Sequence, residues 1–152
     1  EGTTFHIYFP VSTDQIADEN NTSEICGGTE KILVVDDVKE QREMAARILG
    51  KLGYQVDTVV NGHDALTYIR NTPPDLVVLD MIMEDGFDGL DTYREVLKLC
   101  PHQRCVIASG FAETSRVRQA QELGAGTYVR KPYTTNAIGF AVRQELDRAL
   151  SA

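Results

Sequence analysis

The chain has 152 residues, 42% of them hydrophobic and 25% charged, which is typical of one globular domain with a modest core. No apolar run approaches the roughly 20 residues that a membrane-spanning helix needs, so we expect no direct membrane contact by these residues. The formal net charge is −8, and the first 30 residues contain six acids but no lysine or arginine. The rest of the chain is nearly balanced, and no basic patch predicts nucleic-acid binding.

Three cysteines, Cys26, Cys100 and Cys105, form neither an even-numbered disulfide framework nor the spacing of a metal site. Unpaired thiols are typical of a reducing compartment. We therefore expect reduced cysteines in a cytoplasmic protein.

From Lys31 onward, short apolar runs alternate with amphipathic stretches. The runs are rich in Val, Ile and Leu, as strands buried on both faces must be. The predicted strands cover residues 32–35, 55–60, 76–79, 105–108 and 127–129. Apolar residues in the stretches after them recur at the spacing of one helix face. The predicted helices cover residues 44–52, 61–72, 90–99, 114–123 and 134–150.

Residues that commonly start or end helices flank the predicted ones. Gly53 and Gly124 follow the first and fourth helices, where a C-terminal stop is expected. Asn61 can cap the second helix, and Thr134 or Thr135 can cap the last. The first helix has an apolar stripe of Met44, Ile48 and Leu52, with Ala45 and Leu49 beside it. The stripe of the last helix consists of Ile138, Val142, Leu146 and Leu150.

The alternation predicts an α/β domain of the (βα)5 kind, with a parallel sheet that carries helices on both faces. Crossovers between parallel strands are right-handed, so the chain winds one way for the first two strands and the other way for the rest. This doubly wound parallel sheet should have the strand order 2-1-3-4-5. Ligands of such sheets bind outside the carboxyl ends of the strands.

Polar residues occupy those strand ends. Asp36 and Asp37 follow the first strand, Asp80 the third, Ser109 the fourth, and Lys131 comes shortly after the fifth. Three carboxylates at one edge repel each other unless a cation or a proton compensates. A hard divalent ion with oxygen ligands does so, and Mg²⁺ suits a site that also handles phosphate. Lys131 offers a compact positive charge for a phosphoryl oxygen, and Ser109 offers a hydroxyl donor.

Each of these residues also has an ordinary explanation. An aspartate at a strand end is usually a helix cap or a solvated loop residue, and an Asp-Asp pair alone is weak evidence. Ser109 could simply begin a turn, and Lys131 could be a surface lysine. A chance assembly of the whole set, in the required order on a (βα)5 pattern, is improbable. The set therefore favours a site for phosphoryl chemistry.

Four stretches carry a close resemblance to the receiver, or response-regulator, family of two-component signalling: ILVVDD, LVVLD, VIASG and YVRKP. The resemblance covers about residues 31–150. It implies a flavodoxin-like fold and a module that takes a phosphoryl group from phosphohistidine with the help of Mg²⁺ and switches its surface for signal relay. Such a module is not an enzyme that acts on an external substrate.

The resemblance also implies a role for each matching residue. Asp80 is the expected phosphoacceptor, and Lys131 pairs with the phosphoryl group. The expected metal ligands are Asp36, Asp37, Asp80 and the backbone carbonyl of Ile82. Ser109 and Tyr128 match the positions that switch on phosphorylation, and Pro132 is expected to follow a cis peptide bond.

The loop after Asp80 departs from the family pattern. Relatives usually read Met-Pro there, with a glycine soon after, whereas residues 83–89 read Met-Glu-Asp-Gly-Phe-Asp-Gly. The loop is one residue longer and lacks proline. Receivers fused to kinases often have a longer loop of this kind.

The leader carries a second, shorter resemblance. The sequence EGTTFHIYFP at residues 1–10 is similar to the end of a histidine-kinase ATPase domain, although an unremarkable amphipathic strand would read the same way. We therefore expect residues 1–11 to be a remnant of that domain, residues 12–30 an acidic linker, and residues 31–152 the C-terminal receiver of a hybrid sensor kinase. An orphan strand at residues 3–9 should pair with the leader of another copy or pack on a sheet edge.

Two other functions are compatible with an aspartate at the end of a parallel strand. A dehalogenase-like phosphatase requires a second aspartate two residues after the nucleophile, and this chain has Ile82 at that position. The sequence also contains no P-loop motif. A non-phosphorylated pseudo-receiver that only binds proteins remains the alternative, but such modules usually lose an acid or the lysine. The expected partners are a histidine kinase or a histidine phosphotransfer protein, with a homodimer left open. The sequence does not decide whether the parent chain carries a sensor or a membrane anchor.

Overall fold

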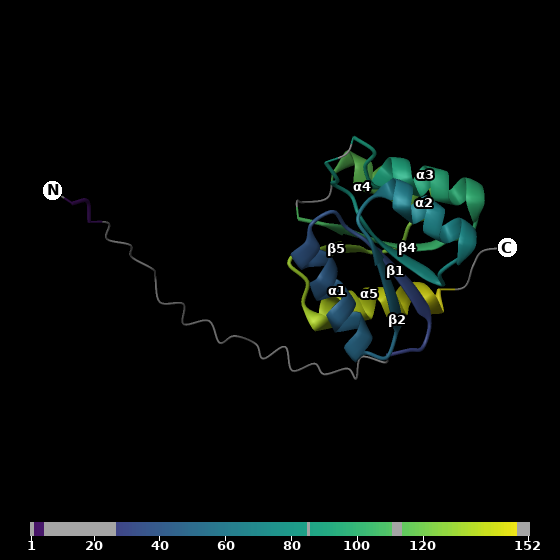
Figure 1. Cartoon of the computed structure of the whole chain (residues 1–152), viewed down its shortest axis with the longest axis horizontal. Helices are drawn as coiled ribbons and strands as arrows, with labels where there is room; N and C mark the ends of the chain where they lie inside the picture. The colour runs from purple at the N-terminus through teal and green to yellow at the C-terminus, as the bar shows by residue number, and fades with distance from the viewer. Residues whose placement is uncertain (1, 5–26, 85, 111–113, 149–152) are drawn as a thin grey trace.

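The computed structural model describes residues 2–4, 27–84, 86–110 and 114–148. Five parallel strands form one sheet in the order β2-β1-β3-β4-β5 (Figure 1). The strands are β1 (Lys31–Val35), β2 (Gln55–Val59), β3 (Leu76–Asp80), β4 (Arg104–Ser109) and β5 (Tyr128–Arg130). The helices are α1 (Lys39–Lys51), α2 (Gly62–Asn71), α3 (Gly89–Leu99), α4 (Ser115–Glu122) and α5 (Thr135–Asp147). The predicted fold class and strand order are confirmed.

Helices cover both faces of the sheet, with α1 and α5 on one side and α2, α3 and α4 on the other (Figure 1). The strands feed two cores because successive side chains point to opposite faces. Leu33 and Leu79 belong to the core under α2, α3 and α4. Ile32 and Val78 belong to the core under α1 and α5. Every residue of β3 is buried, as expected for a central strand that is covered on both faces.

The caps follow the sequence prediction. The side chain of Asn61 accepts a hydrogen bond from the Asp64 N–H at 2.8 Å at the start of α2. Of the two candidate threonines, Thr134 caps α5 and accepts from the Ala137 N–H at 3.1 Å. Gly53 and Gly124 have φ angles of +97° and +107°, the left-handed conformation that ends a helix and suits glycine.

The apolar stripe of α1 differs from the prediction in one respect. Ala45 and Leu49 are its fully buried residues, whereas Met44 is 42% exposed. Ile48 and Leu52 pack against the core and are partly buried. The two rows are adjacent on the helix surface, and the packing of α1 on the sheet decides which row faces inward. In α5, Ile138, Val142 and Leu146 are buried as predicted, and Leu150 lies outside the described residues.

Residues 27–30 contact the body of the domain before β1 begins. The Gly28 N–H donates to the Leu52 carbonyl at 3.1 Å, and the Gln55 N–H donates to the Glu30 carbonyl at 3.0 Å. The Arg143 guanidinium of α5 lies 2.9 Å from the Glu30 carboxylate. The expected pairing of the leader strand falls mostly on residues that the structure does not describe.

Cys100 and Cys105 are free thiols, and Cys26 lies outside the described residues. Within the part of the chain that the structure describes, no helix combines the length and the apolar character needed to cross a bilayer.

Candidate functional site

The predicted site residues meet at the carboxyl edge of the sheet. Asp36 and Asp37 follow β1, while Asp80 and Ser109 are the last residues of β3 and β4. Lys131 follows β5, just before a cis peptide bond to Pro132, as expected. Because β1, β3, β4 and β5 are parallel, their ends bring these five side chains to one edge.

The three carboxylates form a compact oxygen-rich cluster. One carboxylate oxygen of each of Asp36, Asp37 and Asp80 lies within 4.8 Å of the others. Asp36 and Asp80 are buried, at 1% and 5% exposure, and Asp37 is partly exposed, so the cluster opens to solvent on one side. Hard oxygen donors at this spacing fit a divalent cation such as Mg²⁺, which keeps several waters when it binds.

Lys131 provides the positive charge beside this cluster. Its Nζ lies 2.5 Å from Asp36 Oδ2 and 2.8 Å from Asp80 Oδ2, and its side chain is only 9% exposed. One ammonium therefore bridges two buried carboxylates. A bound phosphoryl group would offer the same ammonium further anionic oxygens.

Backbone N–H groups fix the carboxylates. The Val38 N–H donates to Asp36 Oδ1 at 2.9 Å, and the Ile82 N–H donates to Asp80 Oδ1 at 3.2 Å. The third carboxylate, that of Asp37, accepts from the Glu84 N–H at 3.0 Å. Each carboxylate thus has one oxygen held by a backbone N–H, and the second oxygens of Asp36 and Asp80 contact Lys131.

Asp80 titrates unusually for an aspartate. Burial raises its pKa above the ordinary value, and the negative charge of Asp36 acts in the same direction. The ammonium of Lys131 and the Ile82 N–H oppose this rise only in part. Burial, together with the charges of Asp36 and Asp80, also raises the pKa of Tyr133, a buried residue that sequence reasoning did not single out.

The two predicted switch residues are in contact. Tyr128 packs against the core under α2, α3 and α4, and its hydroxyl lies 3.4 Å from the backbone carbonyl of Ser109. The same carbonyl accepts from the Lys131 N–H at 2.9 Å. Ser109 itself is buried. A movement of the Ser109 backbone would therefore change its contacts with both Tyr128 and Lys131.

The unusual loop after Asp80 is anchored at several points. Its Glu84 N–H contacts Asp37, as described above, and Phe87 stacks on His63 of α2 with 4.6 Å between ring centroids. At its end, Gly89 begins α3 so close to Asp80 that a Cβ there would lie 2.3 Å from the Asp80 carbonyl oxygen. Only glycine permits this approach, so α3 starts against the backbone of the predicted acceptor.

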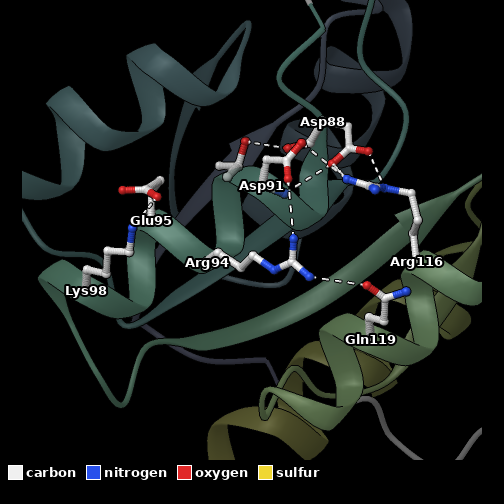
Figure 2. Close-up of polar contacts among 8 residues, drawn as sticks. Asp88, Asp91, Arg94, Glu95, Lys98, Arg116 and Gln119 are labelled. Carbon is white, nitrogen blue, oxygen red and sulfur yellow. Dashed lines mark hydrogen bonds and ion pairs between the residues drawn. The ribbon is translucent and has the colours of Figure 1, made fainter.

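An ion-pair network ties this loop to α4 (Figure 2). Asp88 caps α3 by accepting from the Asp91 N–H at 3.1 Å, and its carboxylate also contacts Arg116 of α4, with Nη2 at 2.7 Å. Arg116 reaches Asp91 as well, at 3.2 Å. Arg94 extends the network from α3 to Gln119 of α4 at 3.2 Å. Sequence reasoning missed these contacts, because nothing in either segment alone pairs residues 28 positions apart.

The family-model comparison decides the class of protein. Residues 32–143 match the model of the response regulator receiver domain. The chain belongs to the response regulator receiver family. Receiver domains are signalling modules that accept phosphoryl groups and generally bind Mg²⁺ at an acidic pocket, and the acidic cluster of this receiver has the donor set for such an ion.

Two curated relatives are similar over most of this receiver. Sporulation initiation phosphotransferase F of Bacillus subtilis (strain 168) is 34% identical over 117 residues, 77% of this chain and 94% of the relative. Chemotaxis protein CheY of Thermotoga maritima is 28% identical over 109 residues, 71% of this chain and 90% of the relative.

A solved structure supports the same assignment. The receiver domain of NtrX from Brucella abortus, with 29% identity and a TM-score of 0.73, covers 78% of this chain and 99% of its own. The longer NtrX chain gives a TM-score of 0.75, but this receiver spans only 27% of it. In NtrX the receiver is thus part of a longer protein, whereas the matched region covers 90% or more of the two curated relatives.

Proposed function

We propose that Asp80 of this receiver accepts a phosphoryl group from a phosphohistidine and that the phosphorylated domain relays the signal to another protein. One observation carries the proposal. The buried carboxylate of Asp80 ends the central strand 2.8 Å from Lys131 Nζ, beside the carboxylates of Asp36 and Asp37.

In the proposed transfer, a carboxylate oxygen of Asp80 attacks the phosphorus atom. The bond from phosphorus to the histidine nitrogen breaks, and its electron pair stays on the imidazole. Lys131 pairs with the phosphoryl oxygens and orients them for in-line attack. The Ile82 N–H, which holds the other oxygen of Asp80 at 3.2 Å, fixes the direction of the nucleophile.

The residues that would hold Mg²⁺ are Asp36, Asp37, Asp80 and the backbone carbonyl of Ile82. When bound, the ion supplies charge neutralisation for the phosphoryl oxygens. Without it, the two buried carboxylates of Asp36 and Asp80 share the single positive charge of Lys131, and the carboxylate of Asp37 lies close by. This imbalance is the reason for proposing that transfer to Asp80 depends on a divalent ion.

Phosphorylation adds negative charge beside Ser109 and Tyr128, and we propose that these two residues carry the switch. Their contact at the Ser109 carbonyl supports a coupled movement. The affected surface would be that of α4, β5 and α5, which binds partners differently in the two states.

The proposal includes the setting of the module. A histidine kinase or a histidine phosphotransfer protein would be the phosphoryl donor or acceptor. The resemblance of residues 1–10 to the end of a kinase ATPase domain supports a hybrid histidine kinase as the parent chain, with the receiver in the cytoplasm. A homodimer is compatible with the proposal but is not required by it.

The test is phosphorylation of the purified protein by a small phosphodonor such as acetyl phosphate, followed by intact-mass measurement. The parent should gain the mass of one phosphate in Mg²⁺ and none in a chelator, and peptide mapping should place it on Asp80. Asp80→Asn should gain none, while Asp57→Asn, a control on the exposed edge strand β2, should behave as the parent. Undiminished labelling of Asp80→Asn would refute the assignment, and a parent that takes no phosphate would favour the pseudo-receiver.

A further inference from the structure

Arg42 in the first turn of α1 reaches back to the acidic pair. Its Nη1 donates to the backbone carbonyl of Asp36 at 2.6 Å and lies 3.4 Å from the carbonyl of Asp37. The side chain is partly buried. The guanidinium thus contacts the peptide groups that carry two of the three clustered carboxylates, and not the carboxylates themselves.

The backbone carbonyls of Asp36 and Asp37 lie between the last paired residue of β1 and the first hydrogen bond of α1. The ladder between β1 and β2 ends at Val35 paired with Val59, followed by one hydrogen bond from the Asp36 N–H to the Val59 carbonyl. The first hydrogen bond of α1 runs from the Arg42 N–H to the Val38 carbonyl. Between these points, Lys131 Nζ and the Glu84 N–H hold the carboxylates of Asp36 and Asp37, and the Val38 N–H donates to Asp36 Oδ1. The backbone carbonyls of the two aspartates are contacted by the Arg42 guanidinium.

We infer that Arg42 is a positioning residue for the cation and phosphoryl site: it fixes the turn at residues 36–37 so that both carboxylates converge with Asp80. This inference rests on the proposed function. A small rotation of the turn would move the carboxylates of Asp36 and Asp37 together. Mg²⁺ demands near-ideal octahedral geometry, so such a displacement would weaken its binding. Arginine suits the task because its guanidinium stays charged and holds donors in a fixed plane.

The change in Mg²⁺ affinity when Arg42 is removed has one sign if Arg42 positions the ligands and the opposite sign if it acts only as a nearby charge. If Arg42 acted only as a neighbouring cation, it would repel Mg²⁺, and its removal would tighten metal binding. If Arg42 positions the ligands, its removal should weaken metal binding although a repulsive charge has been lost. Groups that orient metal ligands typically contribute roughly 10–100-fold to affinity.

The experiment compares Arg42→Met, Arg42→Lys and the control Arg47→Met by titrating metal-free protein with Mg²⁺ in a calorimeter. Arg47 is an exposed arginine on the same helix. We expect Arg42→Met to raise the Kd roughly 10-fold or more, Arg42→Lys to recover part of the loss, and Arg47→Met to match the parent. Circular dichroism before each titration confirms that every variant is folded.

A second readout needs no metal. In chelator, exchange of the Val38 amide, which donates to Asp36, should be faster in Arg42→Met than in the parent, whereas amides in β3 should be unchanged. In acetyl phosphate labelling, Arg42→Met should need more Mg²⁺ for half-maximal rate and approach the parental rate at saturation.

The outcomes separate this inference from the proposed function. Unchanged or tighter Mg²⁺ binding by Arg42→Met, or an Arg42→Lys variant as weak as Arg42→Met, would overturn the positioning role while the parent still binds metal and takes phosphate. A parent that neither binds Mg²⁺ nor takes phosphate would overturn the proposed function and the inference with it.

Discussion

Asp80→Asn should stabilise the fold when divalent metal is absent and should be less stable than the parent when Mg²⁺ is in excess. The Asp80 side chain is buried and shares the ammonium of Lys131 with Asp36, at 2.8 and 2.5 Å. The substitution removes the negative charge but keeps the size of the side chain and an oxygen that can accept from the Ile82 N–H.

The distances give the magnitude. At an effective dielectric constant of about 20, opposite charges at 2.8 Å attract by roughly 6 kcal/mol, and like charges at 4.8 Å repel by roughly 3.5 kcal/mol. Asp80 has one such attraction, to Lys131, and two such repulsions, from Asp36 and Asp37, so the Coulomb contributions nearly cancel. Desolvation of the buried carboxylate then decides the sign. We expect the free energy of unfolding to rise by about 1–2 kcal/mol at neutral pH.

The gain should depend on pH in a definite direction. Burial holds the pKa of Asp80 above its ordinary value in the folded state. Such a carboxyl destabilises the fold while it is ionised, and this cost disappears as the pH falls through the folded pKa toward the ordinary value of about 4. The difference between Asp80→Asn and the parent should therefore be full at neutral pH and vanish at about pH 4 and below.

The assay is urea unfolding followed by circular dichroism, in chelator and in excess Mg²⁺. Metal at 100 times its Kd stabilises the parent by about 2.7 kcal/mol, and a variant that lacks one ligand gains less, so the order of stabilities should reverse. The control is Glu43→Gln, which removes an exposed charge 3.8 Å from Lys39 and should change little in either buffer. If Asp80→Asn is less stable than the parent in chelator at pH 7, the Lys131 attraction outweighs desolvation and the reasoning fails.

Two further predictions concern the loops around the site. Asp88→Asn keeps the cap of α3 but removes the charge that Arg116 contacts (Figure 2), so unfolding free energy should fall by about 0.5–1 kcal/mol at pH 7, after allowance for the partial exposure of Arg116. Burial raises the pKa of Asp88, but hydrogen bonds from Arg116 and from the Asp91 N–H lower it below its ordinary value. The loss of unfolding free energy in Asp88→Asn should therefore persist down to about pH 4 and fade below it. A loss that does not depend on pH would contradict this. The acyl phosphate that we propose for Asp80 should hydrolyse slowly, because the apolar side chains of Ile82 and Phe111 cannot hydrogen-bond an attacking water. Ile82 is 47% exposed, and Phe111 lies outside the described residues. The double variant with Ile82→Asn and Phe111→Glu should lose phosphate about 10-fold faster in excess Mg²⁺, and equal rates of phosphate release in parent and variant would show that these side chains do not control the water.

The sequence predicted the parts of the fold and site that periodicity and strand direction determine. The convergence of Asp36, Asp80 and Lys131 follows from parallel strands whose carboxyl ends share an edge, so it could be predicted without any knowledge of side-chain contacts. The exposure of Met44 could not be predicted, because two adjacent apolar rows on α1 fit the helical period equally well.

Long-range contacts made by charged side chains could not be predicted from the sequence, for a different reason. Arg42 has an ordinary place on an amphipathic helix, and only the return of the chain toward the end of β1 reveals its contact with the Asp36 carbonyl. The pairing of Asp88 with Arg116 likewise depends on how α3 and α4 pack. Such contacts depend on tertiary distance, which neither hydrophobic period nor capping rules encode.

The complete burial of β3 has a consequence for the lifetime of a modification on Asp80. The free energy of local opening is highest for core strands, where it approaches that of global unfolding, and it is much lower for loops and edge strands. β3 is bonded on both sides and buried along its whole length, so we expect its amide hydrogens to exchange slowly. We therefore expect the backbone that carries Asp80 to be among the last parts of the domain to open. Local unfolding of the strand would then contribute little to the hydrolysis of an acyl phosphate on Asp80. Its rate of hydrolysis would depend on the access of water or a partner protein through the loops at the carboxyl edge of the sheet.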